Sequence, residues 1–182
     1  NTFYAPIAEK LCRYLKSKGI KYIVAGGNHA TALPEEVIVF TDIVVKYEAE
    51  ITLLKILEAL EGKEVDLSKT KGIVYKKDGA VFCNNEAPEI VWDLDKLPFQ
   101  SVDVSLIKYF SLEKKIYTPQ IHELFPHGDR CFFLLASRGC PFGCTYCSNS
   151  LYRKLDKRFG LVRKRSVDNI LAEMAYGLSY GF

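Results

Sequence analysis

Short apolar runs alternate with amphipathic segments near the start of the chain, and this alternation most restricts the fold. Residues 6–18 and Glu50–Leu60 have the apolar spacing of helices, whereas Ile20–Ala25 and Asp42–Lys46 fit buried strands. Strands that alternate with helices are joined by right-handed crossovers, which produce a parallel sheet with helices on both faces. We therefore predict an α/β fold.

A pair of glycines, Gly26 and Gly27, follows the first predicted strand. Ligands of such sheets bind beyond the carboxyl ends of the strands, and glycine lets a ligand approach the backbone closely. The segment Gly26–Thr31 is therefore a candidate ligand loop. Most Gly-Gly pairs are simple turns, so the pair alone fits a nucleotide site or no site at all.

Three cysteines, Cys140, Cys144 and Cys147, lie within eight residues of one another. So close a trio is a poor disulfide framework and an incomplete tetrahedral zinc site, but three thiolates can hold a cubane iron-sulfur cluster and leave one iron open. Gly139 and Gly143 allow the backbone to turn tightly around such a cluster. The segment is therefore predicted to be a cluster-binding loop.

A structural zinc site is the alternative, with Cys131, His127 or His122 as the fourth ligand. Zinc ligands usually come as two pairs separated by a dozen or more residues, whereas these candidates lie upstream at irregular spacing. The remaining cysteines, Cys12, Cys83 and Cys131, are scattered and are predicted to be reduced core or surface residues.

The composition is that of a globular chain, with 182 residues, 48% hydrophobic and 26% charged residues, and a net charge of +3. The longest apolar run, Cys131–Ala136, is far shorter than the roughly 20 residues that cross a bilayer, so we expect no membrane span and a cytoplasmic location. Positive charge gathers after the cysteines, and we interpret it as a solvated face rather than a nucleic-acid site, with contact to a ligand carboxylate or phosphate left open. These basic residues are Arg153, Lys154, Lys157, Arg158, Arg163, Lys164 and Arg165.

The rest of the chain shows a hairpin, a linker and a second strand-helix unit. Gly72–Tyr75 and Ala80–Cys83 flank an Asp-Gly turn, and residues 96–126 lack a sustained period, with Trp92 as the predicted anchor of the linker. Phe132–Ala136 is predicted to be a strand that leads into the cysteine loop. Ser166 is predicted to cap a helix with one apolar face, formed by Val167, Ile170, Leu171, Met174 and Leu178.

The spacing Cys-x3-Cys-x2-Cys, with Tyr146 just before the last cysteine, resembles the signature of the radical S-adenosylmethionine (SAM) superfamily. The resemblance implies that Cys140, Cys144 and Cys147 ligate a [4Fe-4S] cluster whose fourth iron binds SAM, with Tyr146 near the adenine. It also implies reductive cleavage of SAM to a 5'-deoxyadenosyl radical, chemistry that belongs to the cofactors while the protein places them.

The segments 24–31, 34–36 and 47–50 resemble the cobalamin-binding domain that precedes the barrel in the B12-dependent branch of that superfamily. The resemblance implies that Gly26 and Gly27 contact the nucleotide tail of cobalamin, with three neighbours on the same loop. These are Asn28, His29 and Thr31. His29 is interpreted as a polar loop residue rather than a cobalt ligand. Tyr47 departs from the family, which commonly has glycine there.

The resemblances predict a partial Rossmann-like (flavodoxin-like) cobalamin-binding domain followed by the first βα unit of a radical SAM TIM-like barrel. The predicted boundaries are 1–95 for the end of the cobalamin-binding domain with its hairpin, 96–126 for the linker, and 127–182 for the start of the radical SAM domain. The chain begins with Asn1 and has one strand-loop-helix unit after the linker, so we expect a fragment that is inactive alone.

The parent is then expected to be a radical SAM methyltransferase or cyclase with a [4Fe-4S] cluster, SAM and cobalamin as cofactors. Its expected partners are a small-molecule substrate and an electron donor such as flavodoxin or ferredoxin. Two alternatives remain, namely a non-catalytic cobalamin sensor and a zinc-stabilised binding module.

Overall fold

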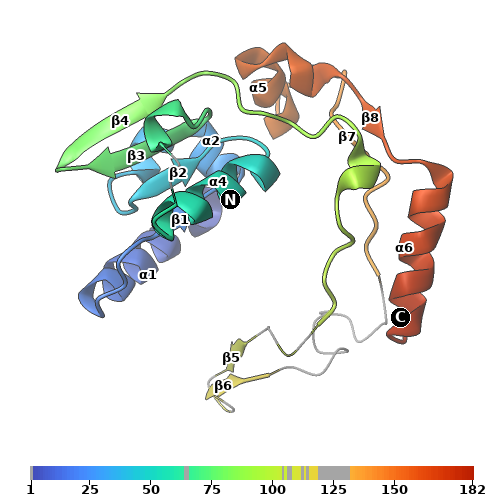
Figure 1. Cartoon of the computed structure of the whole chain (residues 1–182), viewed down its shortest axis with the longest axis horizontal. Coiled ribbons are helices and arrows are strands. Elements are labelled where there is room, and N and C mark those ends of the chain that lie inside the picture. The colour runs from blue at the N-terminus through green and yellow to red at the C-terminus, as the bar shows by residue number, and fades with distance from the viewer. Residues whose placement is uncertain are drawn as a thin grey trace. The chain divides into compact units, whose positions relative to one another are not determined.

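The computed structural model describes residues 2–63, 66–103, 105, 108–111, 113, 115–118 and 132–182. Its contacts divide the chain into two compact units, drawn in Figure 1. The first unit contains residues 1–91 and 139–161, so the cysteine segment belongs to it, and the second contains residues 92–138 and 162–182. Because these units are defined by contacts between residues, they do not test the predicted domain boundaries at residues 95 and 126, which stay a prediction.

The first unit is built around one sheet in which the order of strands is β1-β2-β3-β4. β1 and β2 are parallel, and the other two pairs are antiparallel. The predicted α/β class is confirmed, but the sheet is mixed, because the predicted hairpin joins the parallel pair at β2. The elements of this unit are η1 (Thr2–Tyr4), α1 (Ala5–Ser17), β1 (Val24–Ala25), α2 (Asn28–Ala32), α3 (Pro34–Val37), β2 (Ile43–Val45), α4 (Glu50–Leu60), η2 (Leu67–Lys69), β3 (Ile73–Lys77), β4 (Ala80–Asn84), α5 (Ser148–Leu155) and η6 (Lys157–Gly160).

Both faces of this sheet are covered, as expected for crossover connections. Val44 and Val74 point to one face and pack with Val37 and Ile38 from the α3 side. Alternate residues point to the other face, where Ile56 of α4 packs against them with no exposed surface. These residues are Ile43, Val45, Ile73 and Tyr75. The alternation of side chains along β2 thus supplies two cores from one strand.

The predicted helix Glu50–Leu60 has those bounds in the structure. The predicted strand Ile20–Ala25 was too long, because only Val24–Ala25 pairs with β2. The segment Gly26–Thr31, expected as a loop, contains the start of α2, which begins at Asn28. The two glycines alone therefore form the turn after β1.

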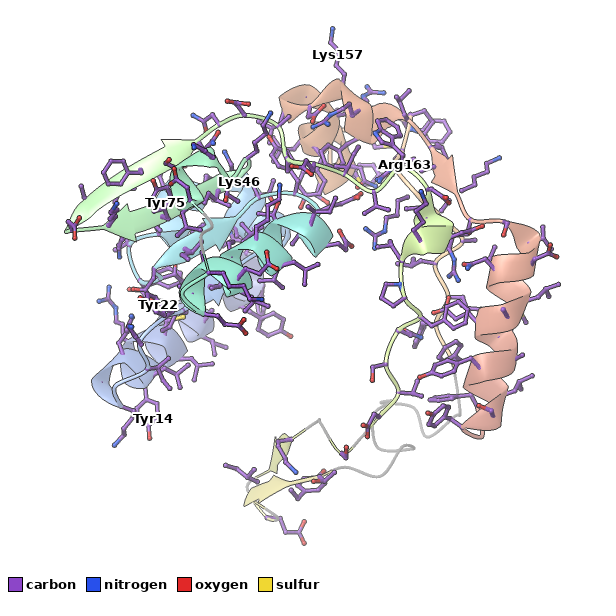
Figure 2. All side chains as sticks on the ribbon, viewed as in Figure 1. Tyr14, Tyr22, Lys46, Tyr75, Lys157 and Arg163 are labelled. Carbon is purple, nitrogen blue, oxygen red and sulfur yellow. The ribbon has the colours of Figure 1, made fainter. Side chains whose placement is uncertain are left out.

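The predicted hairpin is confirmed as β3 and β4, which meet at Asp78 and Gly79. Both residues have positive φ, +50° and +78°, as a two-residue turn between twisted strands requires. Figure 2 shows Lys46 and Tyr75 within this unit; Lys46 is buried, and its ammonium donates to Asn85 Oδ1 at 2.9 Å.

Among its described residues, the second unit has two small antiparallel sheets and a long helix. β5 pairs with β6, and β7 pairs with β8, where Arg138 lies opposite Arg163. Its elements are η3 (Leu94–Lys96), β5 (Tyr109–Ser111), β6 (Lys115–Tyr117), β7 (Ser137–Arg138), β8 (Arg163–Lys164) and α6 (Val167–Ser179). Trp92 is the predicted anchor. The Arg163 guanidinium carbon lies over the Trp92 ring, 5.9 Å from the ring centre.

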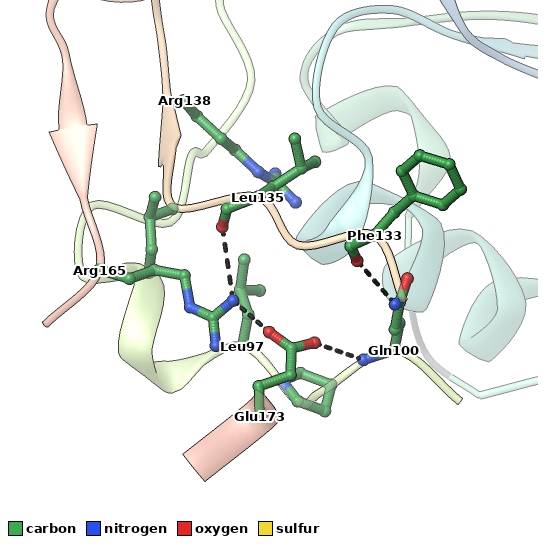
Figure 3. Close-up of a pocket in the computed structure, with 9 residues that line it drawn as sticks. Leu97, Gln100, Phe133, Leu135, Arg138, Arg165 and Glu173 are labelled. Atoms are coloured by element: carbon green, nitrogen blue, oxygen red, sulfur yellow. Dashed lines mark hydrogen bonds and ion pairs between the residues drawn. The ribbon is translucent and has the colours of Figure 1, made fainter. Parts of the chain in front are cut away.

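The prediction of a strand at Phe132–Ala136 was wrong, since the strand is Ser137–Arg138 and pairs antiparallel with an unpredicted strand. Side chains take two of the backbone acceptors of the predicted run, and the backbone amide of Arg165 takes that of Ala136 at 3.0 Å. Gln100 Nε2 donates to the carbonyl of Phe133 at 2.8 Å, and Arg165 donates to that of Leu135 (Figure 3). An apolar run is a strand only where another backbone satisfies it.

The helix predicted after Ser166 is confirmed as α6, and the Ser166 hydroxyl accepts from Asn169 N at 3.1 Å as a cap. Its buried residues are Glu173 and Gly177. A Cβ atom at Gly177 would lie 2.7 Å from the Phe132 ring, so the ring packs on this glycine. Four of the predicted apolar-face residues are exposed in the structure, namely Val167, Leu171, Met174 and Leu178.

In the parts of the chain that the structure describes, no helix has both the length and the apolar character needed to cross a membrane. The alternative zinc ligands Cys131, His127 and His122 lie outside the described residues, as do residues 119–131 of the linker and second domain.

Candidate functional site

The cysteine loop begins at Gly139, directly after β7. Gly139 has a φ of +89°, and a Cβ atom there would lie 2.1 Å from the carbonyl oxygen of Leu161. Only glycine fits both the left-handed backbone and this contact. Next to it, the Cys140 amide donates to the carbonyl of Phe159 at 3.1 Å, so the start of the loop is held against η6.

The three motif cysteines are free thiols in this loop. Cys140 and Cys147 are half-buried and Cys144 is exposed, while the Cys147 amide closes a turn onto the carbonyl of Cys144 at 3.2 Å. Within the described ranges, no three side chains of the His, Cys, Asp or Glu type converge closely enough to hold a metal ion. The donor set fits a thiolate-bound cluster in its chemistry, and the loop would have to draw its sulfurs together to bind one.

Tyr146, predicted to lie near adenine, projects from the loop with 91% of its surface exposed. Its ring makes no contact that fixes its direction within the described chain. Its exposure leaves the ring available to a planar ligand.

Arg153 of α5 makes a second contact that holds the cysteine loop. Its guanidinium donates to the carbonyl of Pro141, between Cys140 and Cys144. Cβ atoms at Gly143 and Gly160 would lie 2.9 Å and 2.8 Å from the Arg153 side chain, so both glycines leave the room through which it passes. Arg153, predicted to belong to a solvated face, instead supports the cysteine loop in the structure.

The Gly26–Gly27 turn lies at the carboxyl end of β1, as predicted. Gly27 has a φ of +97° and precedes α2, and a Cβ atom there would meet no atom within 4 Å. Glycine is required at this position by the backbone conformation, and the space beside it is open. This is the arrangement that a ligand approaching the backbone needs.

The three polar residues after this turn have different surroundings. His29 is half-buried, and its Nδ1 lies 3.2 Å from the hydroxyl of Thr2. Thr31 is buried, and its hydroxyl accepts from the Tyr47 amide at 2.8 Å. Asn28 reaches the helix after the cysteines: its Oδ1 accepts from the Tyr152 hydroxyl at 2.5 Å, and its Nδ2 donates to Ser148 Oγ at 3.4 Å. The two predicted cofactor segments are therefore joined in one unit.

Tyr47 adds a second contact between these segments. Its ring stacks on that of Phe159, with centres 5.1 Å apart and planes 9° from parallel. Its φ of +65° is left-handed, a conformation that favours glycine, which accounts for the glycine that the family commonly has at this position. Burial raises the pKa of the Tyr47 phenol, and the Asp156 carboxylate adds to that rise.

Asp156 and Arg158 form an ion pair beneath this stack. Arg158 donates to both carboxylate oxygens, at 2.7 to 3.2 Å, and also to the carbonyl of Pro88 at 2.8 Å. Burial alone would raise the pKa of Asp156, but the hydrogen bonds and charge of Arg158 outweigh it and lower that pKa. The predicted solvated face is thus only partly correct: Lys157 points away from the ribbon in Figure 2, while Arg158 and the buried Arg163 have structural roles.

Sequence reasoning missed Tyr152, Phe159 and Arg153 as parts of this site. Asn28 and Tyr152 are 124 residues apart, and no local pattern pairs them. Gly143 and Gly160 were the available signal for Arg153, because glycines that flank a long side chain often leave it room.

The described residues also line cavities away from these loops. In the first unit, a cavity of about 550 Å³ opens at the amino end of β2, the edge opposite Gly26–Gly27, with Tyr22, Asp42 and Lys77 in its wall. In the second unit, a cavity of about 180 Å³ is lined by Arg165 and Glu173, which form a buried ion pair (Figure 3). Glu173 Oε1 also accepts a hydrogen bond from the backbone amide of Gln100 at 3.2 Å. We assign the ion pair to the packing of α6.

No family model matches the chain. Its sequence is 30% identical over 158 residues to the uncharacterized methyltransferase PH0819 of Pyrococcus horikoshii, a match that covers 85% of this chain and 30% of that protein. The anaerobic magnesium-protoporphyrin IX monomethyl ester cyclase of Synechocystis sp. is 30% identical over 108 residues, which are 58% of this chain and 18% of the cyclase. The chain spans less than a third of either relative.

The radical S-adenosylmethionine methyltransferase TsrM of Kitasatospora setae is similar in structure, with a TM-score of 0.60 at 16% identity, over 98% of this chain and 31% of TsrM. One TsrM structure holds tryptophan as substrate and a SAM analogue, and another, with the same TM-score, holds cobalamin and a [4Fe-4S] cluster. At this identity the likeness concerns the mixed α/β fold. Sequence and fold together make the chain a relative of the B12-binding-domain-containing radical SAM proteins.

Proposed function

We propose that this chain supplies the cobalamin-binding and cluster-binding segments of a radical SAM enzyme that methylates or oxidatively cyclises a small-molecule substrate. One observation carries the proposal: the Cys140–Cys147 loop and the Gly26–Gly27 turn, each predicted to bind one cofactor, lie in the same compact unit, and the helices that directly follow them are hydrogen-bonded to each other. The related methyltransferase and cyclase support the reaction class.

In this proposal Cys140, Cys144 and Cys147 hold a [4Fe-4S] cluster, and Tyr146 lies near the adenine of SAM. When bound, such a cluster supplies one electron to the sulfonium of SAM. The chain's own contribution is the shape of the loop. Gly139 turns the backbone into it, and the Arg153 guanidinium fixes the carbonyl of Pro141 between two of the ligands.

On the cobalamin side, we assign Gly26 and Gly27 to the nucleotide tail. The space beside Gly27 at the carboxyl end of β1 is open, while a Cβ atom at Gly26 would lie 3.5 Å from the carbonyl oxygen of Val45. His29 is half-buried beside this turn, and in the described chain only its Nδ1 has a partner, whereas Asn28 and Thr31 use their side chains within the protein. We therefore assign the direct contacts to the glycine backbone and to His29, and a supporting role to Asn28 and Thr31.

The finer fold and the partners belong to the same proposal. Residues 1–95 would form the end of a flavodoxin-like cobalamin-binding domain, and residues 127–182 the first βα unit of a radical SAM barrel. The protein would take electrons from a donor such as flavodoxin or ferredoxin. The fold likeness to TsrM over nearly the whole chain supports this order of parts.

The test uses the natural protein that carries this chain, purified without oxygen and reconstituted with iron and sulfide. We expect about four irons per chain, uptake of added cobalamin, and 5'-deoxyadenosine from SAM after reduction. Cys144→Ala should abolish the cluster and the product. Cys83→Ala is the matched control, because Cys83 is an exposed thiol of β4 outside the loop, and its activity should be unchanged.

Each alternative has its own result in this experiment. A zinc-stabilised module would contain zinc in place of iron and sulfide and would lack the brown chromophore of a cluster. A cobalamin sensor would bind cobalamin without cleaving SAM. Full activity in Cys144→Ala would contradict the ligand assignment.

A further inference from the structure

We propose that Asn28 and Tyr152 are a positioning pair that fixes the cobalamin turn relative to the cluster loop. The inference rests on the proposed function and deepens it, because it assigns roles to two residues that bind neither cofactor. It concerns how the two sites are held at a fixed separation within the first unit.

The place of each residue in the chain makes the contact informative. Asn28 is the first residue of α2 and directly follows Gly27. Ser148 is the first residue of α5 and directly follows Cys147, while Tyr152 lies one turn later on the same face. A contact among these three side chains therefore joins the last cluster cysteine to the cobalamin turn through very few covalent bonds.

The Asn28 amide is bound at both of its ends. Its oxygen accepts from the Tyr152 hydroxyl at 2.5 Å, and its nitrogen donates to Ser148 Oγ at 3.4 Å. The amide thus bridges two positions of α5 that are one turn apart, which resists both translation and rotation of that helix. Burial raises the pKa of the Tyr152 phenol, so the hydroxyl stays a donor at neutral pH.

A second set of contacts reinforces the same arrangement. The Tyr47 ring stacks on Phe159, and the Tyr47 amide donates to the buried hydroxyl of Thr31. Tyr47 follows β2, Thr31 is in α2, and Phe159 follows α5. Three elements are therefore tied together at the carboxyl edge of the parallel strands, where ligands of such sheets bind.

A purely structural role predicts a different outcome from a positioning role. If the contact only stabilised the fold, its loss would lower stability and the occupancy of both cofactors together. If it sets their separation, its loss would leave both cofactors bound and change the interaction between them. Reduced cluster and cob(II)alamin are both paramagnetic, so electron paramagnetic resonance reports that interaction without any turnover.

The experiment uses the natural protein with cluster and cobalamin bound, and compares Tyr152→Phe, Asn28→Ala and the double variant with wild type. Tyr14→Phe is the control, because Tyr14 is an exposed ring of α1 in the same unit. We expect iron content and cobalamin occupancy within about twofold of wild type, with the magnetic interaction between the centres changed in both single variants. The double variant should resemble Asn28→Ala, because that change already removes the hydrogen bond to Tyr152 together with the one to Ser148.

The coupled reaction gives a second measure. A misplacement of about 1 Å can cost on the order of 10²-fold in rate. Transfer of a methyl group from SAM to cob(I)alamin, with S-adenosylhomocysteine as the leaving group, should therefore slow by about 10- to 100-fold in Tyr152→Phe. Wild-type magnetic interaction in both single variants, with both cofactors bound, would overturn the inference. If wild type itself takes up no cobalamin or no cluster, the proposed function fails, and this inference fails with it.

The variant Asn28→Ser keeps a short polar side chain but cannot reach both partners, and it decides the matter if Tyr152→Phe does not fold. An altered magnetic interaction in Asn28→Ser supports the inference, and an unaltered one overturns it.

Discussion

Gly27 and Gly139 lie in the two predicted cofactor segments and have similar positive φ angles, but the atoms around them differ. Gly27 has a φ of +97° with nothing within 4 Å of a would-be Cβ atom, whereas at Gly139, with a φ of +89°, that atom would lie 2.1 Å from a backbone carbonyl oxygen. One glycine keeps a space open and the other permits a close approach of two chain segments. The same residue type thus has opposite packing roles at the two sites.

The largest effect is expected from Gly139→Ala. The new methyl group would overlap the Leu161 carbonyl and also force a left-handed alanine, so the loop must leave η6. We expect a loss of more than about 3 kcal/mol in unfolding free energy and no retained cluster. Urea unfolding and iron analysis measure both. An unchanged unfolding midpoint would show that the loop is not held in this position.

Arg153→Met should have the next largest effect, because it removes the charged donor to the carbonyl of Pro141 while keeping most of the side-chain length. A hydrogen bond to a charged group contributes about 1.5 to 3 kcal/mol, so the cluster should be lost faster on exposure to a chelator. The neighbouring exposed Lys154→Met is the control. Equal rates of iron loss in the two variants would argue against a role for Arg153 in the loop.

Gly27→Ala sharpens the comparison on the open side. The backbone strain of a left-handed alanine is about 1 to 2 kcal/mol. Gly62→Ala is a matched control, since Gly62 has a φ of +82°, no atom within 4 Å, and a place after α4 away from both loops. Both variants should lose similar stability, but only Gly27→Ala should weaken cobalamin binding in a titration. Equal cobalamin affinity in both would place the cofactor elsewhere.

The smallest effect concerns pH. The pKa of Asp156 is lowered in the folded state by Arg158, so its stabilising contribution is present above the ordinary carboxyl pKa of about 3.9 and is lost as the pH falls through the lower folded value. Asp156→Asn should remove about 1 kcal/mol at neutral pH and flatten the stability profile in acid. Thermal unfolding from pH 6 to pH 3 measures this. A profile parallel to that of wild type would contradict the assignment.

Local patterns predicted much of the fold. Helix Glu50–Leu60 and the hairpin at Asp78–Gly79 are set by residues close in sequence, and both are where we predicted them. The run Phe132–Ala136 has the composition of a strand, yet the side chains of Gln100 and Arg165 donate to two of its carbonyls, and no local signal reveals such distant side chains. Pattern reasoning fails where a distant side chain replaces a backbone partner.

The candidate site likewise has residues that local sequence patterns predicted and residues that they did not. The cysteine spacing and the Gly-Gly pair were visible in the sequence, since glycine and thiol chemistry restrict those positions strongly. The bridge from Asn28 to Tyr152 was not, because each residue alone is an ordinary polar side chain. Tyr47 is intermediate: its departure from the family pattern was noted, and the left-handed backbone explains why it matters.

The pairing of Arg138 with Arg163 has a consequence for protein engineering. Arg138 is the last residue of β7, and Arg163, its partner, is the first residue of β8. The two ends of the segment 139–162 are therefore held together by one pair of strand residues. The pairing of β7 with β8 offsets the conformational entropy that is lost when the ends of this segment are brought together. A segment of different length from another protein could be grafted between the same two residues, and the ladder would still join its ends.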